Sequence, residues 1–566
     1  MAINSDAILT KAQNWLQPHF DQNTQAAIHK LLNGPKEQLE DAFYTSLAFG
    51  TGGMRGIMGP GDNRINKYTL GKATQGLSNY LKRVFTDHPL RVVIAYDCRH
   101  NSDTLARTVA EVFSANGIEV KLFSSLRPTP ELSFAVRHLK CHCGIVLTAS
   151  HNPPEYNGYK VYWQDGGQLV PPQDKAIIEE INQLDYTDIQ FNPQTELIEL
   201  IDAQVDQVFI EASVRAVPQC ASAQDRKELG VVFTPLHGTS VTMIPPVLSK
   251  AGFDQVSIVA AQAKPDGDFP TVSSPNPEEP QALKMAMEEA DRCNADLVIG
   301  TDPDCDRLGI AVRNSEGQLT LLNGNQAMII KTHFLLNRLT TTQRNTNSFV
   351  ASTIVSTPMM RLIAEDFGVD YKEGLTGFKW IAKMVKDYPE QDFVGGGEES
   401  FGYMVGDFVR DKDAVTASLL ICEIAAYLNG KGSSVWDYLQ EIYRRYGYFQ
   451  ESLISQVKKG RQGAEEIKSI MTSFRTAPPK TIANSPVVKI EDYLNQSVLD
   501  LVNERESKLD LPVANVLIFY TQNGAKIAAR PSGTEPKIKY YISVRGKSGQ
   551  ELDPKIEAIK KDLNLN

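Results

Sequence analysis

The sequence has few of the features that mark secreted or membrane proteins. Its seven cysteines are sparse for 566 residues and odd in number, which argues against a disulfide framework and favours free thiols in a reducing compartment. No uninterrupted apolar run approaches the ~20 residues of a membrane-spanning helix, and the first twenty residues show no basic stretch followed by an apolar core. We therefore expect a cytoplasmic protein that does not bind a membrane.

Positive charge is also in deficit. The net charge is −10, which offers no broad attraction to nucleic acid, so we expect no nucleic-acid partner. The glycine loop "FGTGGMRG" matches neither the Walker phosphate-binding pattern nor the dinucleotide fingerprint. An anionic ligand must therefore be bound by a local group of cations, and nothing in the sequence specifies an oligomeric state.

The length predicts about four domains at roughly 150 residues each. Apolar, β-branched runs such as "LRVVIAYD", "CGIVLTAS", "ADLVIGTD" and "SFVASTIVS" alternate with helical patterns such as "PQALKMAMEEADRC", which is typical of α/β units with buried, mostly parallel strands. The end of the chain differs, because "VLIFYTQNGAKIAARPSG" reads as short strands joined by a hairpin turn. We predict three α/β domains, at residues 1–205, 206–322 and 323–448, and a C-terminal α+β domain at residues 449–566.

Ser150 stands at the end of the predicted strand "CGIVLTAS" and is followed by "HNPPEYNGYK". Ligands bind at the carboxyl ends of strands in α/β units, so this serine is placed as a nucleophile would be. Alternatively, Ser150 and Asn152 only shape a turn before two prolines. His151 is not expected to activate the hydroxyl of its sequence neighbour, and the stretch is not the Gly-x-Ser-x-Gly elbow of hydrolases.

Three aspartates occupy alternate positions after another predicted strand, in "ADLVIGTDPDCDRLG": Asp302, Asp304 and Asp306. Carboxylates this close repel one another unless a cation lies among them, and hard oxygen ligands favour Mg²⁺ over zinc. A calcium EF-hand is excluded, since Arg307 and Arg313 stand where the loop needs Gly and Glu. A haloacid-dehalogenase-like phosphatase also uses an Asp-x-Asp at a strand end, but gives Asp306 and Arg307 no role.

Two further loops carry polar groups suited to a phosphosugar. In "DFVGGGEESFGYM", the glycines permit close approach of a ligand, and Glu398 and Ser400 can hydrogen-bond sugar hydroxyls. In "AARPSGTEPKIKY", a guanidinium, two hydroxyls and free backbone N–H groups could form a phosphate cradle. Either loop could instead be an ordinary surface turn.

The order of these motifs, "TASHNPPEYNGYK", "PDGDFPTVSSPNPEEP", "DPDCDR", "TGFKW", "GGGEESFG", "RDKDAV" and "RPSGTEPKIK", resembles the α-D-phosphohexomutase superfamily. The resemblance extends from Arg55 to Lys539. It implies a four-domain architecture around a central cleft, with three mixed-sheet α/β domains and a C-terminal α+β domain.

Carried over to this sequence, the resemblance implies a role for each matching residue. Ser150 would carry the transferred phosphoryl group, and its phosphate would bind Mg²⁺ together with Asp302, Asp304 and Asp306. Proton transfer or charge stabilisation would fall to Arg55, Lys160 and Lys412. The substrate would be bound by Arg307, Lys379, Glu398, Ser400, Arg530, Ser532, Gly533 and Thr534, the last four holding the phosphate that is not transferred.

The implied reaction is a mutase cycle, an isomerisation in carbohydrate metabolism. Phosphoserine donates its phosphoryl group to a sugar monophosphate, the sugar 1,6-bisphosphate turns round, and the serine takes phosphate back from the other end. The motifs "TGFKW" and "GEES" resemble phosphoglucomutases, "TGFKW" in particular the branch that includes phosphopentomutases. We expect interconversion of glucose 1-phosphate and glucose 6-phosphate, with mannose or pentose phosphates as alternatives and an Mg-dependent sugar phosphatase as a remote one.

Overall fold

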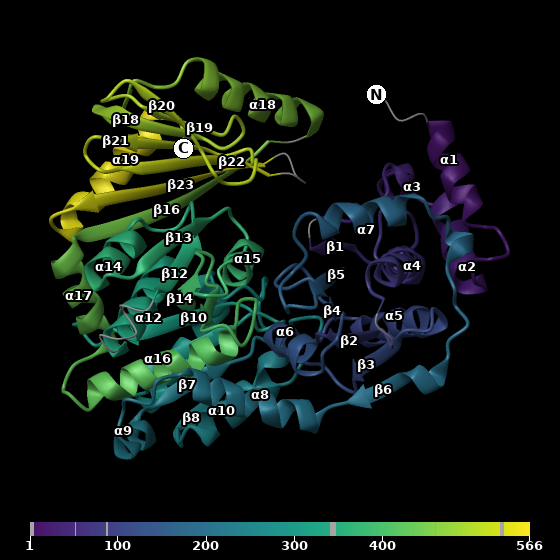
Figure 1. Cartoon of the computed structure of the whole chain (residues 1–566), viewed down its shortest axis with the longest axis horizontal. Helices are drawn as coiled ribbons and strands as arrows, with labels where there is room; N and C mark the ends of the chain where they lie inside the picture. Colours follow the sequence, from purple (N-terminus) through teal and green to yellow (C-terminus); the bar gives the residue numbers. More distant parts are fainter. Residues whose placement is uncertain are drawn as a thin grey trace. The chain divides into compact units, whose positions relative to one another are not determined.

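The structure is a computed structural model that describes residues 5–50, 52–86, 89–339, 347–458, 460–532 and 537–565. It divides into two compact units, and Figure 1 labels most of their helices and strands. The first unit comprises Met1–Asn323, Ala382–Pro389 and Ser400–Ser434, and the second comprises Gly324–Ile381, Glu390–Glu399 and Val435–Asn566. Each unit contains two of the larger sheets, and the borders of the four domains predicted from the sequence remain predictions.

The first sheet of the first unit has the strand order β1-β5-β4-β2-β3-β6. Its strands are β1 (Gly53–Ile57), β2 (Arg91–Tyr96), β3 (Glu119–Phe123), β4 (Cys143–Leu147), β5 (Tyr156–Trp163) and β6 (Ile198–Ile201). β2 pairs in parallel with β3 and β4, while β5 runs antiparallel to β4 and β1. The sheet is therefore mixed, and β4 delivers the Ser150 loop at its carboxyl end.

Helices cover both faces of this sheet. Alternate residues of β4, such as Ile145 and Leu147, join a core with α4 (Lys67–Val84), α5 (Ser102–Ala115) and α7 (Gln173–Asn182). On the other face, a Cβ placed on Gly144 would lie 2.4 Å from Val136 of α6 (Thr129–His138). Gly144 is thus needed for the close packing of α6, whose first turn reaches the site described below. Three short helices, α1 (Ser5–Asn14), α2 (Gln22–Leu32) and α3 (Lys36–Phe43), form a separate small core with Trp15.

The second sheet of the first unit has the order β11-β10-β9-β7-β8. Its strands are β7 (Val231–Thr234), β8 (Val256–Ile258), β9 (Leu297–Thr301), β10 (Leu308–Arg313) and β11 (Leu319–Leu322). β7 is parallel to β8 and β9, and β9 is antiparallel to β10. Helix α11 (Pro280–Cys293) contacts β7 and β9, whereas α8 (Ala203–Ala216), α10 (Ile244–Lys250) and α16 (Ala414–Asn429) pack on one another. The turn between β9 and β10 carries the three aspartates.

In the second unit, β12 (Ser348–Thr353) pairs in parallel with β13 (Asp370–Gly374) and β14 (Asp392–Gly397). Helices α12 (Gly324–Arg338), α14 (Met359–Phe367) and α17 (Val435–Tyr446) contact one another beside these strands. Gly368 ends α14 in the left-handed conformation with φ 66°, which glycine adopts at little cost. This part of the unit holds the loops that carry Lys379 and Glu398.

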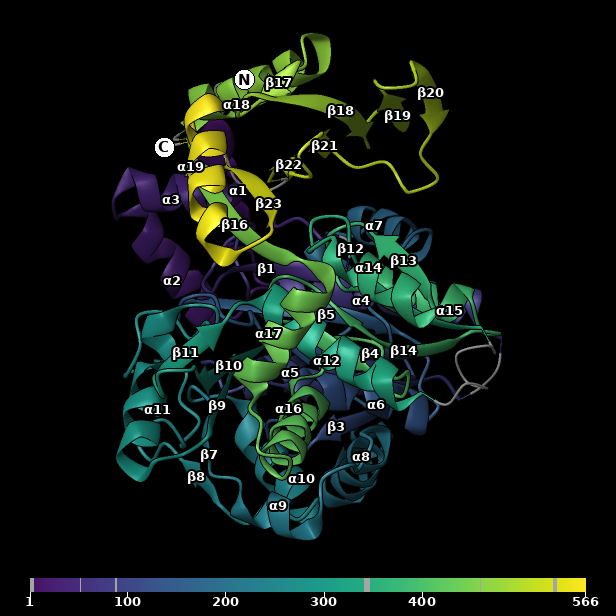
Figure 2. The same cartoon turned by 90° about the vertical axis from the view of Figure 1, so that its left-hand side faces the viewer.

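The last sheet is antiparallel throughout and follows the order β16-β23-β22-β21-β18-β19-β20, with β17 beside β18. The strands are β16 (Tyr448–Val457), β17 (Thr481–Ile482), β18 (Ser485–Asp492), β19 (Ser497–Asp500), β20 (Arg505–Lys508), β21 (Leu517–Thr521), β22 (Lys526–Pro531) and β23 (Lys537–Gly546). Helices α18 (Gly460–Thr476) and α19 (Leu552–Asp562), both visible in Figure 2, share one core with this sheet. On the opposite face, Ile518 and Tyr541 pack with Ile354 and Leu375, so the two sheets of this unit share a core.

The predicted fold class is confirmed. The quoted runs form the buried strands β2, β4, β9 and β12, and "PQALKMAMEEADRC" forms α11. The "QNG" turn joins β21 to β22, with Gly524 at φ 85°. Among the described residues, no helix is long and apolar enough to cross a membrane.

His333 on α12 provides a pH-dependent term in stability. Its Nδ1 lies 2.6 Å from the Tyr438 hydroxyl, and burial lowers the pKa of His333 from 6.5 to about 4, assisted by the nearby Arg445 cation. An unfolded histidine takes up a proton near pH 6.5 and the folded one only near pH 4, so this stability is present above pH 6.5 and lost as the pH falls. Between pH 7 and pH 5 we expect a loss of about 2 kcal/mol in the free energy of unfolding from this residue.

Urea unfolding at both pH values, for the wild type and His333→Gln (H333Q), measures this term. The variant should lose about 2 kcal/mol less than the wild type over that interval. Equal losses in the two proteins would contradict the assignment.

Candidate active site

The Ser150 loop follows β4 and presents the serine in a strained conformation. Ser150 is buried, with φ at 52°, a region that non-glycine residues rarely occupy. Its backbone N–H donates to the Thr148 hydroxyl at 2.8 Å, and its own hydroxyl donates to Asp302 Oδ2 at 2.7 Å. The strain is thus stabilised locally, and the serine Oγ is aimed at the aspartate loop 152 residues away in sequence.

The His151 side chain lies next to the nucleophile. Its Nδ1 lies 3.1 Å from Ser150 Oγ, but the serine hydroxyl donates its proton to Asp302, so the expectation that His151 does not activate Ser150 stays a prediction. Ser150 has a positive φ, and the side chains of these two consecutive residues are in contact. Burial, with the nearby Arg307 and Arg55 cations, lowers the pKa of His151 from 6.5 to about 2, so the imidazole is neutral at physiological pH.

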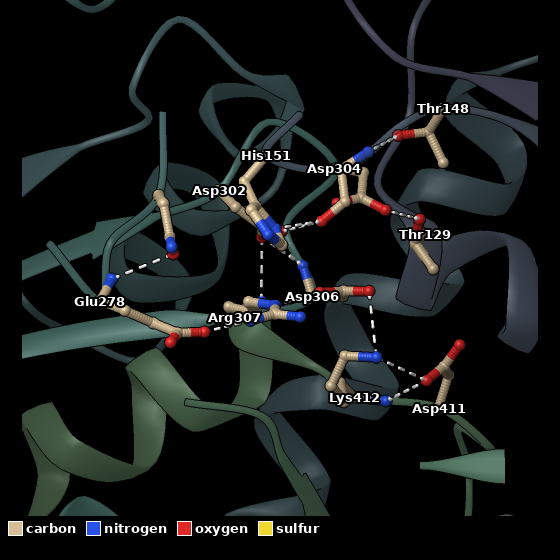
Figure 3. A network of polar contacts seen from close by, with 12 residues as sticks. Thr129, Thr148, His151, Glu278, Asp302, Asp304, Asp306, Arg307, Asp411 and Lys412 are labelled. Carbon is tan, nitrogen blue, oxygen red and sulfur yellow. Dashed lines mark hydrogen bonds and ion pairs between the residues drawn. The ribbon is translucent and has the colours of Figure 1, made fainter. Parts of the chain in front are cut away.

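The aspartate loop connects β9 to β10 and is closed by its own carboxylate. Asp302 Oδ1 accepts the backbone N–H groups of Asp306 and Arg307, both at 3.0 Å, and Cys305 turns the chain at φ 59°. The ligand oxygens of Asp302, Asp304 and Asp306 all lie within 4.8 Å of one another, and the three residues are buried. Figure 3 shows the three carboxylates converging with the surrounding cations.

Two lysines compensate part of this negative charge. Lys160 Nζ, on β5, lies 2.6 Å from Asp304 Oδ2 and 3.1 Å from Asp306 Oδ2. Lys412 Nζ lies 3.2 Å from Asp306 Oδ2 and 3.4 Å from Asp411 Oδ1. Burial alone would raise the pKa of Asp306, but the two lysines and Arg307 outweigh it and hold that pKa below its usual value.

Asp302 has the opposite balance. Burial, followed by the charges of Asp306 and Asp304, holds the pKa of Asp302 well above its usual value. Burial alone would lower the pKa of Lys160, but the charges of Asp304 and Asp306 outweigh it, so this pKa is raised and the amine stays cationic. The three carboxylates of the loop thus outnumber the two lysine amines that contact them.

The donor set fits a hard divalent cation. Asp304 Oδ1 and Asp306 Oδ1 are buried and accept no hydrogen bond from any described residue, which is costly for a carboxylate oxygen unless a cation satisfies it. Asp302, Asp304 and Asp306 form the one group of candidate metal ligands in the described part of the chain. An all-carboxylate set favours Mg²⁺, Mn²⁺ or Ca²⁺ over zinc.

Two arginines also approach these loops in the first unit. Arg55, on β1, donates from Nη1 to Asn152 Oδ1 at 2.8 Å. Arg307 forms an ion pair with Glu278 and lies 3.8 Å from Asp306 Oδ1. The structure thus places Ser150, the aspartates, Arg55, Lys160, Arg307 and Lys412 in one unit.

The predicted residues for binding the sugar are divided between the two units. Lys379 begins α15 (Lys379–Asp387), with its amine 5.5 Å from the Trp380 ring centroid. Glu398 accepts from the backbone N–H of Gly377 at 2.8 Å, a contact between "TGFKW" and "GGGEES" that the sequence did not indicate. Both lie in the second unit, whereas Ser400 is half-buried in the first.

The predicted phosphate cradle is described only in part. Arg530 is the penultimate residue of β22 and lies opposite Lys539 of β23, and Ser532 donates its backbone N–H to Lys537 O at 2.7 Å. Gly533 and Thr534 lie outside the described residues. The role of this loop stays a prediction.

Sequence reasoning missed several residues that support the site. Thr129, the first residue of α6, donates its hydroxyl to Asp304 Oδ2 at 2.9 Å and its backbone N–H to Asp304 O at 2.9 Å. Asp411 accepts the Tyr162 hydroxyl at 2.6 Å and so fixes the carboxylate beside Lys412. Thr148 holds the backbone of Ser150. Asp411 and Thr148 stand inside the motifs "RDKDAV" and "TASHNPPEYNGYK", which could have drawn attention to them, whereas Thr129 stands in none of the motifs.

Comparison with known proteins agrees with this geometry. Three family descriptions match the chain, "Phosphoglucomutase/phosphomannomutase, alpha/beta/alpha" domain I at residues 46–188, domain II at 207–317 and domain III at 323–446. A phosphoglucomutase of Staphylococcus epidermidis is 40% identical over 523 residues, covering 90% of this chain and 93% of that protein. A phosphoglucomutase of Staphylococcus aureus is 40% identical over 528 residues, covering 92% and 93%.

Solved structures support the fold. A putative phosphomannomutase from Thermus thermophilus superposes with a TM-score of 0.68 at 20% identity, covering 92% of this chain and 98% of that one. The open form of the Paramecium phosphoprotein pp63/parafusin gives 0.67 at 18% identity, covering 92% and 96%. The chain therefore belongs to the phosphoglucomutase branch of the α-D-phosphohexomutase superfamily.

Proposed function

We propose that this chain, as a phosphoglucomutase of that family, interconverts glucose 1-phosphate and glucose 6-phosphate in the cytoplasm through a phosphoserine at Ser150. The observation that carries the mechanism is the 2.7 Å hydrogen bond from Ser150 Oγ to Asp302, beside two further carboxylates and two lysines. Phosphoryl transfer is catalysed mainly by positioning and by electrostatic stabilisation, and this arrangement supplies both.

In the forward half-reaction, a sugar hydroxyl oxygen attacks the phosphorus of phosphoserine, and the bond from phosphorus to Ser150 Oγ breaks. The glucose 1,6-bisphosphate then binds in the reversed orientation. Ser150 Oγ attacks the other phosphoryl group, which regenerates phosphoserine and releases glucose 6-phosphate. The 6-hydroxyl of the sugar loses a proton when it accepts phosphate, and the 1-oxygen takes up a proton when its phosphoryl group returns to Ser150. Protons and phosphate therefore balance over the cycle, which consumes only the monophosphate.

The described residues favour particular roles in this cycle. Lys160 and Lys412 lie among the carboxylates as cations, and we assign them to stabilising charge on the transferred phosphoryl group. Arg55 orients the Asn152 side chain two residues after the nucleophile, and Arg307 lies at the edge of the aspartate loop. Lys379, Glu398 and Ser400 are assigned to the substrate, and Arg530, Ser532, Gly533 and Thr534 to the phosphate that is not transferred.

We further propose that Asp302, Asp304, Asp306 and an oxygen of the Ser150 phosphate bind Mg²⁺. The unpaired buried oxygens of Asp304 and Asp306 support this assignment. Bound there, the cation would withdraw charge from the phosphoryl group. The protein residues set the number and direction of its oxygen ligands.

The test is an activity panel. The 1-phosphates of glucose, mannose, ribose and glucosamine are supplied with Mg²⁺ and a trace of the matching bisphosphate. We expect the highest kcat/KM for glucose 1-phosphate. A higher value for mannose or ribose 1-phosphate would move the assignment to a phosphomannomutase or phosphopentomutase, and release of inorganic phosphate without isomerisation would replace it with a phosphatase.

Thr129→Val (T129V) should weaken Mg²⁺ binding although it replaces none of the proposed metal ligands. Valine fills the same volume but cannot donate to Asp304 Oδ2, the contact made at 2.9 Å by the Thr129 hydroxyl. Loss of an outer hydrogen bond to a metal ligand typically costs ~10- to 100-fold in metal affinity or activity. Titration of activity against Mg²⁺ should show a half-saturating concentration raised by about tenfold.

Thr129→Ser (T129S) is the matched control, because serine retains the hydroxyl. It should require nearly the wild-type Mg²⁺ concentration. The same Mg²⁺ dependence in the valine and serine variants would contradict a role for the hydroxyl.

A further inference from the structure

Arg99 lies immediately behind the Ser150 loop and has no part in the cycle described above. It follows β2 in the stretch Asp97–His100, and its side chain is completely buried. Nη1 donates to the backbone carbonyls of Pro153 at 2.8 Å and Tyr156 at 3.1 Å. Nη2 donates to the carbonyl of Ser150 at 2.6 Å and also to that of Asn152. One guanidinium thus contacts four carbonyls of the loop from the nucleophile to the start of β5.

Three of these carbonyls lie where the loop turns and has no neighbouring strand, and the fourth belongs to Tyr156, the first residue of β5. Buried backbone carbonyls without a partner are costly, and a planar fork can satisfy several of them at fixed angles. Asp97 balances the charge, with its Oδ2 3.4 Å from Arg99 Nε and its Oδ1 accepting the Arg99 backbone N–H at 2.9 Å. The Ser102 hydroxyl donates to the same Oδ1 at 2.7 Å. Arg99 is therefore fixed at both its backbone and its side chain.

A second loop of the same unit, residues 266–269, packs against Arg99. The guanidinium lies 5.1 Å from the Phe269 ring centroid. A Cβ placed on Gly267 would lie 2.8 Å from His100 N, 3.0 Å from Cys98 O and 3.1 Å from Arg99 Cα. His100 Nε2 also lies 2.7 Å from Asp268 Oδ1. The stretch 266–269 therefore packs directly against the backbone that carries Arg99.

We infer that Arg99 is a positioning residue for phosphoryl transfer: its guanidinium fixes the carbonyls of Ser150, Asn152, Pro153 and Tyr156, and thereby keeps Ser150 Oγ on Asp302. Ser150 needs such support because its positive φ is strained. The inference rests on the proposed function of Ser150 as the nucleophile. Arg99 acts through the backbone alone, so it should affect the transfer rate and not the affinity for substrate.

Arg99→Lys (R99K) and Gly267→Ala (G267A) test this role. Lysine retains the charge but replaces the planar fork with a single amine, which cannot reproduce the four-carbonyl geometry. The alanine adds a methyl group against residues 98–100 and leaves Arg99 itself unchanged. Arg226→Lys (R226K) is the matched control, because Arg226 is a mostly buried arginine that pairs with Glu423 at 2.8 Å.

Two rates are measured for each folded protein: steady-state kcat and KM for glucose 1-phosphate, and single-turnover phosphorylation of Ser150 by glucose 1,6-bisphosphate, followed by mass spectrometry. A displacement of about 1 Å at a reacting atom costs ~100-fold. We therefore expect R99K and G267A to lower kcat and the single-turnover rate by ~10- to 100-fold, with KM within about twofold of wild type. R226K should keep both rates.

The outcomes separate the inference from the function on which it rests. Wild-type rates in folded R99K or G267A would overturn the positioning role, as would a fall in R99K that R226K reproduces. If R99K does not fold, the two rates of G267A test the positioning role. Absence of phosphoserine at residue 150 in the wild type would instead overturn the proposed mechanism.

Discussion

Replacing Ser150 by alanine is expected to abolish mutase turnover, with kcat lowered by about four orders of magnitude or more. Among the residues that the structure describes, Ser150 Oγ is the hydroxyl that contacts Asp302, at 2.7 Å, and none of the others is placed to replace the lost nucleophile. Coupled assays of glucose 6-phosphate formation measure the effect, and mass spectrometry after incubation with glucose 1,6-bisphosphate shows whether phosphate is bound at residue 150.

Ser78→Ala (S78A) is the matched control for this variant. Ser78 is a buried serine of α4 whose hydroxyl donates to Thr74 O at 2.7 Å. S78A therefore removes the same hydroxyl oxygen as S150A, at a position outside the site. It should retain wild-type kcat and acquire the same phosphoserine. Full mutase activity in S150A would remove Ser150 from the mechanism.

Removal of the metal, or of one of its proposed ligands, should have the second largest effect. Asp304→Asn (D304N) retains an oxygen that can accept from Thr129 but loses the charge that faces Lys160 and the cluster. We expect kcat lower by at least ~100-fold, the scale of losing one electrostatic contact to the reacting group. Chelation of divalent ions should abolish wild-type activity, and added Mg²⁺ should restore it.

Asp413→Asn (D413N) is the control for the loss of a buried carboxylate. Asp413 caps α16 by accepting the N–H groups of Val415 and Thr416 at 2.9 and 3.1 Å, and asparagine can accept the same bonds. It should retain activity and Mg²⁺ dependence. Wild-type activity in D304N, or in chelator-treated enzyme, would contradict the metal assignment.

Much of the fold could be predicted from the sequence because its signals are local. A run such as "ADLVIGTD" is apolar over the length of one strand, which predicts a buried strand wherever it lies in the protein. The "QNG" turn likewise predicts a hairpin from the conformations that Asn and Gly accept. By contrast, the packing of α1, α2 and α3 around Trp15 depends on Tyr68 and Phe43, which no local pattern identifies.

The conformation of the site was less accessible to the sequence. The contact between His151 Nδ1 and Ser150 Oγ was not anticipated, because the sequence does not reveal a serine with positive φ. Thr129 and Arg99 were not singled out either. Their importance comes from hydrogen bonds to loops 175 and 51 or more residues away in sequence, and such contacts leave no periodic signal.

The sequence by itself determined the alternation of strands and helices, the three aspartates after one strand and the serine after another, because each is a property of a short stretch of chain. Only the tertiary structure decided that Ser150 Oγ meets Asp302, that Lys160 and Lys412 share Asp306, and that Arg99 supports the nucleophile from behind. The physical reason is that hydrogen bonds and ion pairs act over about 3 to 4 Å, and the packing of whole sheets and helices determines which side chains come that close.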